Sequence, residues 1–175
     1  MPYTTPEDLL STDSFIDYWG ETVQMISKIL VPHDGTEMSE KAFEKAVELA
    51  KMFKAELVLF HVIEHVLEPL PASVIIDDKD LINRARRSAR RQLEKGWDKM
   101  VEVKTHQIKK DNVTLSGECR YGSAAEQILR FTKNNKIDMI VMGSHRLKGI
   151  SKIKALGSVT RKVSESADSP VLIVR

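Results

Sequence analysis

A stretch near the carboxyl end of the chain combines glycines with groups that bind phosphate. Residues 142–159, "MGSHRLKGISKIKALGSV", hold three glycines and no acidic residue, and six hydroxyl or cationic side chains lie between the first and last glycine. A helix that begins at Gly157-Ser158 would present free N–H groups and the positive end of its dipole. Ser158 and Thr160 would add hydroxyl donors. The stretch predicts an anion site, and the alternative is a solvated basic loop.

The elements that must position this loop follow from the apolar pattern. Continuous apolar runs of this length are typical of strands buried on both faces, as in parallel sheets. Helices between them imply crossover connections and an open three-layer α/β/α sandwich with a five-stranded parallel sheet. Strands are expected at 28–32, 56–63, 114–119, 138–143 and 170–175, with helices at about 39–53, 77–103, 123–135 and 157–167.

Local signals predict how the helices begin and what precedes the sheet. Ser39 is the expected N-cap of the first helix, and Ser123 with Glu126 matches a capping box. Residues 1–25 stand outside the alternation of strands and helices. Their Pro6 and their apolar spacing predict an N-terminal helical arm, followed by one domain over 26–175.

Composition excludes several classes of protein. The 175 residues are 42% apolar and 30% charged, with a net charge of +2, which is typical of a soluble folded protein. The single cysteine, Cys119, excludes an internal disulfide framework and predicts a small buried apolar side chain in a reducing compartment. No run is long and apolar enough to span a membrane, and the acidic first residues do not resemble a signal peptide. We therefore expect a cytoplasmic protein with no membrane partner.

Polar residues follow two further expected strands, where ligands of open parallel sheets bind. Asp34 precedes a glycine in a turn, so its carboxylate would either bind a ribose hydroxyl or metal ion, or stabilise the turn through the backbone. His33 and His61 lack neighbouring carboxylates or cysteines at metal-ligand spacing, and His61 is expected to be a half-buried strand histidine with its hydrogen bonds satisfied.

Three ordered blocks of the chain resemble the universal stress protein family. These are "KILVPHDGTEMSEKAFEKAVELAK", "YGSAAEQILRFTKNNKIDMIVMGSH" and "GSVTRKVSESADSPVLIVR", and the resemblance covers roughly 26–175. The resemblance implies a Rossmann-like, adenine nucleotide alpha hydrolase-like fold and a homodimer formed through the last strand, 170–175. One branch of the family binds ATP through a Gly-x2-Gly-x9-Gly-(Ser/Thr) loop, and another branch lacks the loop and binds no nucleotide.

This chain departs from that loop at two points. Gly143 matches the first glycine and Gly157-Ser158 the last pair, but Arg146 stands at the second glycine and the loop is one residue longer. An arginine there would strain or fill a site that needs glycine. A guanidinium can also bind phosphate through two hydrogen bonds, so side-chain contacts could replace backbone contacts.

The resemblance also implies roles for individual residues. Pro32, His33 and Asp34 would line the adenosine pocket, with Val62 packed on the adenine. Met142, Gly143 and His145 would form its floor, and Gly157, Ser158, Val159 and Thr160 would surround the phosphates. His33 replaces the small residue usual at its position.

The function expected is therefore that of a stress-response protein regulated by ATP or AMP, with or without Mg²⁺. The alternative is a dimeric scaffold that binds protein partners and no nucleotide. We expect a binding protein with at most slow ATP hydrolysis, because no nucleophile–base pair is evident and the strand-one turn lacks the paired glycines of ATP pyrophosphatases. The basic stretch 84–95 has no aromatic residue or recognition motif, which favours a solvated helix face over nucleic-acid binding.

Overall fold

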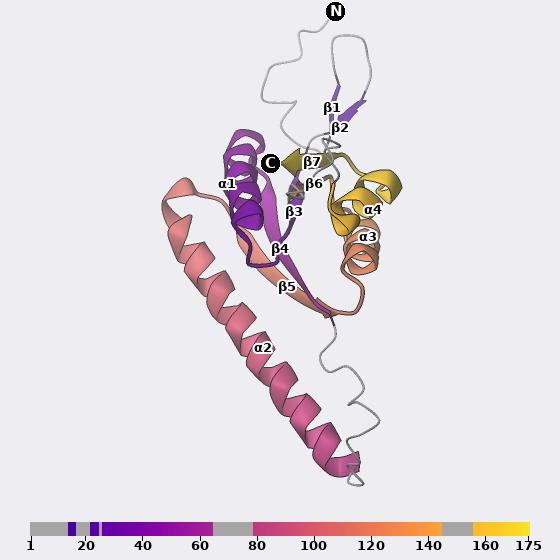
Figure 1. Ribbon diagram of the computed structural model, residues 1–175. Helices are drawn as coiled ribbons and strands as arrows, with labels where there is room; N and C mark the ends of the chain where they lie inside the picture. Colours follow the sequence, from indigo (N-terminus) through magenta and orange to yellow (C-terminus); the bar gives the residue numbers. More distant parts are fainter. Residues whose placement is uncertain (1–13, 17–21, 25, 65–78, 145–155) are drawn as a thin grey trace, which may run out of the picture.

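A wholly parallel five-stranded sheet forms the centre of the protein. The computed structural model describes residues 14–16, 22–24, 26–64, 79–144 and 156–175 (Figure 1). The strands lie in the order β5-β4-β3-β6-β7. They are β3 (Lys28–Pro32), β4 (Glu56–Ile63), β5 (Leu115–Tyr121), β6 (Met139–Gly143) and β7 (Val171–Val174). The predicted α/β fold is confirmed, and the predicted strand ends differ by at most two residues.

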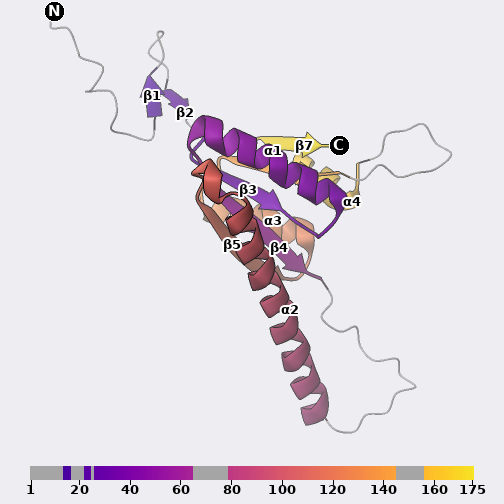
Figure 2. The ribbon, with the colours of Figure 1, turned by 90° about the vertical axis from the view of Figure 1, so that its left-hand side faces the viewer.

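Helices cover both faces of this sheet, as Figures 1 and 2 show. One face carries α1 (Glu37–Phe53) and α2 (Lys79–Gln107), and the other carries α3 (Ala124–Asn134) and α4 (Ser158–Ser166). A short 3-10 helix, η2 (Lys109–Asp111), follows α2. The second helix is four residues longer at its carboxyl end than the sequence pattern indicated, and its amino-terminal half extends beyond the sheet.

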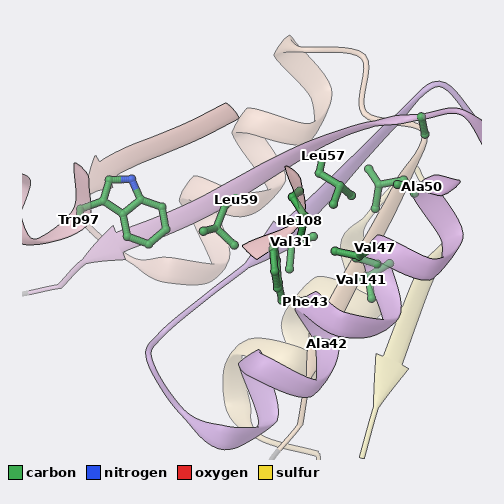
Figure 3. Close-up of a cluster of buried hydrophobic side chains, with 13 residues drawn as sticks. Val31, Ala42, Phe43, Val47, Ala50, Leu57, Leu59, Trp97, Ile108 and Val141 are labelled. Atoms are coloured by element: carbon green, nitrogen blue, oxygen red, sulfur yellow. The ribbon is translucent and has the colours of Figure 1, made fainter. Parts of the chain in front are cut away.

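Two apolar clusters hold these layers together. Successive residues of a strand point to opposite faces, so Ile29 and Val31 pack with Phe43 of α1, whereas Leu30 packs with Ile128 and Val163 on the other side. Figure 3 shows the first cluster, in which side chains of α1 and Trp97 of α2 lie against apolar side chains of the sheet. Cys119 lies half-buried at the edge of this cluster, where burial and then the Glu94 carboxylate raise the pKa of its thiol.

The helix starts differ from the predicted caps. Thr36, not Ser39, is the N-cap of α1, and its hydroxyl accepts a hydrogen bond from the Ser39 N–H at 3.3 Å. Ser123 occupies the N-cap position of α3 but makes no side-chain capping bond. Instead, Glu64 Oε1 accepts the N–H of Ala124 at 2.6 Å. A carboxylate from the end of β4 thus stabilises this helix start, which a purely local sequence rule does not detect.

The predicted N-terminal helical arm is wrong for the residues of it that the structure describes. Ser14–Ile16 (β1) and Thr22–Gln24 (β2) form an antiparallel strand pair. Phenylalanine, isoleucine, threonine and valine favour strands, and the intervening Gly20 disfavours a continuous helix. These preferences outweighed the helical spacing of the apolar residues. The rest of the segment 1–25 lies outside the described residues.

A carboxylate joins the starts of the two central strands. Asp138 precedes β6, and its Oδ2 accepts hydrogen bonds from Ser27 N at 2.9 Å, Ser27 Oγ at 2.8 Å and Lys28 N at 2.9 Å. The Asp138 N–H donates in return to the Lys28 carbonyl at 3.0 Å. The register between β3 and β6 is therefore fixed by side-chain as well as backbone bonds.

Candidate functional site

A cavity of about 420 Å³ opens at the carboxyl ends of β3, β4 and β6. Helices α1, α3 and α4 begin around it, because they follow β3, β5 and β6, whose carboxyl ends lie at the same edge of the parallel sheet. Its walls combine apolar side chains with backbone and hydroxyl groups. They consist of Pro32, His33, Asp34, Thr36, Met38, Ser39, Phe60, His61, Val62, Glu64, Ala124, Ile128, Met142, Gly143, Gly157, Ser158, Val159 and Thr160.

The structure brings ten of the twelve predicted site residues to this cavity. They come from three separated parts of the chain: Pro32, His33 and Asp34, then Val62, then Met142, Gly143, Gly157, Ser158, Val159 and Thr160. The other two, His145 and Arg146, lie outside the described residues. That these side chains bind a nucleotide remains a prediction, but their convergence is a property of the fold.

The start of α4 presents donors to the cavity. Gly157 is the N-cap and has no side chain to satisfy the first N–H groups of the helix. The hydroxyl of Thr160 donates to the Gly143 carbonyl at 3.2 Å, which ties the first turn of α4 to the end of β6. Ser158 is exposed and Val159 half-buried. This arrangement suits an anion at the helix start.

Gly143 has a structural role that the sequence alone did not reveal. A Cβ added there would lie 2.4 Å from the carbonyl oxygen of Met38 and 2.5 Å from its carbonyl carbon. The end of β6 therefore approaches the first turn of α1 too closely for any side chain. The resemblance placed Gly143 in the floor of the pocket, whereas the reason for a glycine that the structure shows is the close approach of α1.

Asp34 stabilises the turn between β3 and α1. Its Oδ1 accepts the Thr36 N–H at 3.0 Å and the Thr36 hydroxyl at 2.6 Å. Burial alone would raise the pKa of Asp34, but the bonds from Thr36 outweigh it and hold the pKa below its ordinary value. The turn-stabilising role considered for Asp34 is therefore present, and the ionised carboxylate also lines the cavity.

His33 is buried beside the same turn in a fixed tautomer. The Gly35 N–H donates to Nδ1 at 3.2 Å, so Nδ1 carries no proton and Nε2–H donates to Glu40 Oε1 at 3.1 Å. Burial lowers the pKa of His33, and although the Glu40 carboxylate opposes this effect, the pKa stays below its ordinary value. A neutral imidazole with both nitrogens engaged offers a ligand its ring surface, not a charge.

Glu40 extends this contact to α2. Its other oxygen accepts a hydrogen bond from Lys104, whose ammonium group is buried and lies 4.9 Å from the centre of the Phe43 ring. Burial would raise the pKa of Glu40, but the bond from Lys104 and the contact with His33 outweigh it, so the pKa is lowered. The cavity wall is thus connected to the end of α2 through hydrogen bonds between side chains.

His61 behaves as predicted for a half-buried strand histidine. Its Nδ1 donates to the His33 carbonyl at 2.8 Å, and its ring stacks on Trp97 of α2 with centroids 5.0 Å apart. Both contacts support the cavity wall formed by β3 and β4.

Sequence reasoning missed part of the apolar wall and one acid. Phe60 and Ile128 lie beside the predicted Val62, and Glu64 lies next to the start of α3. The position of Glu64 immediately after a strand was a usable signal. Ile128 was not detectable as a site residue, because a buried apolar residue on a helix is ordinarily part of the core.

The geometry of His33 predicts acid-sensitive stability. The unfolded chain binds a proton near pH 6.5 while the native imidazole resists it, so stability is complete above about pH 6.5 and declines as the pH falls below that value. The loss is at most about 1.4 kcal/mol per pH unit for one proton. Thermal unfolding between about pH 7.5 and 5.5 measures it, well above the window in which Glu40 would titrate.

The variant His33→Gln should lose less stability on acidification over this range than the wild type. His106→Gln, which changes an exposed histidine near the end of α2, is the matched control and should keep the wild-type dependence. Identical pH dependence in wild type and His33→Gln would contradict the assignment of a neutral buried imidazole.

The sequence and fold match those of one family. The family model described as the universal stress protein family matches residues 25–175. The universal stress protein YxiE of Bacillus subtilis is 32% identical over 157 residues, which covers 86% of this chain and 100% of that protein. The solved structure of MJ0577 of Methanocaldococcus jannaschii superposes with a TM-score of 0.65 at 25% identity, covering 86% of this chain and 96% of that one.

Two of the solved structures that share the fold contain nucleotides. A universal stress protein in complex with cAMP has a TM-score of 0.54 at 21% identity and covers 85% of this chain and 96% of that one. The universal stress protein of Archaeoglobus fulgidus in complex with dAMP has a TM-score of 0.55 at 19% identity and covers 86% and 99%. At these identities the likeness concerns the fold alone.

Proposed function

Because this chain belongs to the universal stress protein family, we propose that it binds an adenine nucleotide, ATP or AMP, and acts as a nucleotide-regulated stress-response protein. The observation that carries the proposal is the start of α4: backbone donors without a capping side chain face an apolar cavity and follow a basic, acid-free segment. The nucleotides bound by two relatives of the same fold support this choice of ligand.

The cavity residues fit the parts of such a ligand. Phe60, Val62 and Ile128 provide apolar surface for a base, and the neutral ring of His33 adds to it. The ionised Asp34 carboxylate suits a ribose hydroxyl. Phosphate oxygens would accept hydrogen bonds from the N–H groups at the start of α4, where the helix dipole favours negative charge.

Isothermal titration of the full chain with ATP and AMP, each with and without Mg²⁺, tests the proposal. We expect micromolar affinity for at least one of these nucleotides, and a difference between the Mg²⁺ conditions would show whether the cation takes part. The absence of any binding heat up to about millimolar nucleotide would exclude the proposed function, because a millimolar dissociation constant corresponds to a binding free energy of only about 4 kcal/mol.

Two substitutions of Arg146 test whether this side chain helps the protein to distinguish ATP from AMP. If its guanidinium replaces the glycine of the family loop, Arg146→Ala should weaken ATP more than AMP, because only ATP extends to a γ-phosphate. If the side chain obstructs the loop, Arg146→Gly should instead tighten ATP. Titration of both variants separates these cases, and unchanged affinity in both would show that Arg146 makes no contact with the ligand.

The departure of this chain from the glycine loop of the nucleotide-binding branch favours a second candidate function. Arg146 in place of the second glycine, together with the additional loop residue, weakens the match to the nucleotide-binding branch. The second candidate is a scaffold that binds protein partners without nucleotide. The titration above distinguishes the two candidates. With either function, we expect the protein to catalyse at most slow ATP hydrolysis and to be located in the cytoplasm.

We also propose a homodimer formed through β7. This strand pairs only with β6 among the described strands, so its outer edge can pair with a second copy. Leu172 is 38% exposed on it. Light scattering should show a dimer that Leu172→Lys weakens, whereas a monomeric wild type would contradict the proposal.

A further inference from the structure

The second helix is much longer than the sheet that it covers. Its 29 residues correspond to about 44 Å, and Figures 1 and 2 show its amino-terminal half extending past the sheet. The other half is anchored firmly. Trp97 is buried in the core, and a Cβ on Gly117 of β5 would lie 2.4 Å from a methyl group of Val101. The projecting half therefore has a rigid base and an accessible surface.

One face of the projecting half carries no charge. Its members recur every three or four residues between positions 81 and 96 and thus share one side of the helix. It includes two exposed leucines, Leu81 (52% exposed) and Leu93 (47% exposed). The complete uncharged face consists of Leu81, Ile82, Ala85, Ser88, Ala89, Gln92, Leu93 and Gly96.

Basic side chains follow both edges of this uncharged face. Arg84, Arg87, Arg91 and Lys95, at spacings of three, four and four, line one edge, and all four are exposed. Arg86 and Arg90 line the other edge, and the Arg90 guanidinium lies 4.7 Å from the centre of the Tyr121 ring at the end of β5. Between positions 81 and 96 there are six basic residues and one acid, Glu94.

We propose that the projecting half of α2 binds the surface of an anionic lipid bilayer. A helix with an uncharged, partly apolar face between two rows of arginines lies in the interface of such a bilayer, where the apolar side chains enter the headgroup region and the cations meet lipid phosphates. The sequence excluded a membrane-spanning segment, and no helix in the described part of the chain could cross a membrane. A surface contact needs no such helix.

The pattern fits a lipid surface better than the other polyanions. Nucleic-acid phosphates would neutralise the arginines but would leave Leu81 and Leu93 in water, and the face has no aromatic side chain on which a base could stack. A second copy of α2 would bring two strongly basic segments together. An anionic bilayer satisfies both features, because its headgroup phosphates meet the cations while the boundary between headgroups and acyl chains takes up the apolar side chains.

Sedimentation of the full chain with lipid vesicles tests the proposal. With vesicles containing about 30 mol% phosphatidylglycerol in phosphatidylcholine, we expect binding that a salt concentration of about 0.5 M reverses. Vesicles of phosphatidylcholine alone should bind at least tenfold less. The combined variant Arg87→Glu, Arg91→Glu, Lys95→Glu should reduce binding at least tenfold, and Leu81→Ser with Leu93→Ser should reduce it severalfold.

A matched variant controls for net charge. Lys109→Glu, Lys110→Glu, Lys133→Glu makes the same charge change at exposed positions outside the projecting half and should keep wild-type binding. Circular dichroism of each variant verifies that α2 remains helical. The proposal is overturned by wild-type protein that ignores anionic vesicles, by equal losses in the two charge variants, or by leucine substitutions without effect. Tighter binding to a DNA duplex, unaffected by the leucine substitutions, would assign the surface to nucleic acid instead.

Discussion

Replacing Gly143 with alanine is expected to lower the free energy of unfolding by about 3 kcal/mol, because the new Cβ would meet a backbone carbonyl that cannot turn away. The Met38 carbonyl belongs to the first turn of α1, so relief requires the whole helix start to move from the sheet. For a chain of this length, the midpoint of thermal unfolding should fall by roughly 6–12 °C.

Gly96→Ala is the matched control for this substitution. Gly96 lies within α2 and a Cβ there would meet no atom within 4 Å, so alanine should raise stability by about 0.5–1 kcal/mol through its helix propensity. Opposite signs for the same chemical change would assign the effect at Gly143 to close packing. Equal thermal midpoints for Gly143→Ala and the wild type would refute it.

Replacing Gly157 with valine should abolish most nucleotide binding while leaving the fold intact. Gly157 has φ −57° and ψ 153°, which other residues adopt, and the nearest atom to an added Cβ is Thr160 Oγ1 at 4.0 Å. The chain therefore tolerates a side chain at this position. A β-branched side chain would instead occupy space beside the N–H groups proposed to bind phosphate. We expect at least a tenfold loss of affinity, worth about 1.4 kcal/mol.

Two measurements make this result specific. Thermal unfolding of Gly157→Val should stay close to that of the wild type, because a less favourable N-cap residue costs only about 1 kcal/mol. Gly157→Ala, with a smaller side chain, should lose less affinity than valine in the same titration. Wild-type affinity in both variants would show that the start of α4 does not hold the ligand.

The sheet could be predicted from the sequence because each strand carries its own signal. The segments 28–32 and 56–63 are continuous apolar runs, and the structure places β3 and β4 at those residues. Parallel pairing followed from burial on both faces, since α1 and α3 cover opposite sides of the sheet. These features depend on local composition, and local composition is what a single sequence displays.

The errors concern residues whose partners are distant or whose local preferences conflict. Ser123 was predicted to cap α3, but the N–H of Ala124 donates instead to Glu64, which lies 60 positions earlier in the chain. Gly143 was interpreted as ligand-facing, since the approach of Met38 depends on the packing of α1 against β6. The strands at 14–16 and 22–24 arise where helical spacing and strand preference disagreed.

The candidate site was predictable to the extent that it follows strand ends. Pro32, Val62 and Gly143 lie at or near the carboxyl ends of strands, and the topology of a parallel sheet brings such positions together. Ile128 and Phe60 were missed because their sequence positions indicate only core packing. The hydrogen bonds from His33 through Glu40 to Lys104 required the fold, since the last two residues are 64 positions apart.

The pairing of β3 with β6 has a consequence for how the protein folds during its synthesis. The first three core strands to leave the ribosome, β3, β4 and β5, are contiguous in the sheet. The other edge of β3 stays unpaired until β6 has been synthesised. Ser27, which donates a hydrogen bond to the Asp138 carboxylate, lies 111 positions before Asp138 in the sequence. At a translation rate of about 5–20 residues per second, this edge stays unpaired for roughly 5–20 s. During that time the unpaired edge of β3 is exposed to chaperones and to pairing with other chains, which would lead to aggregation.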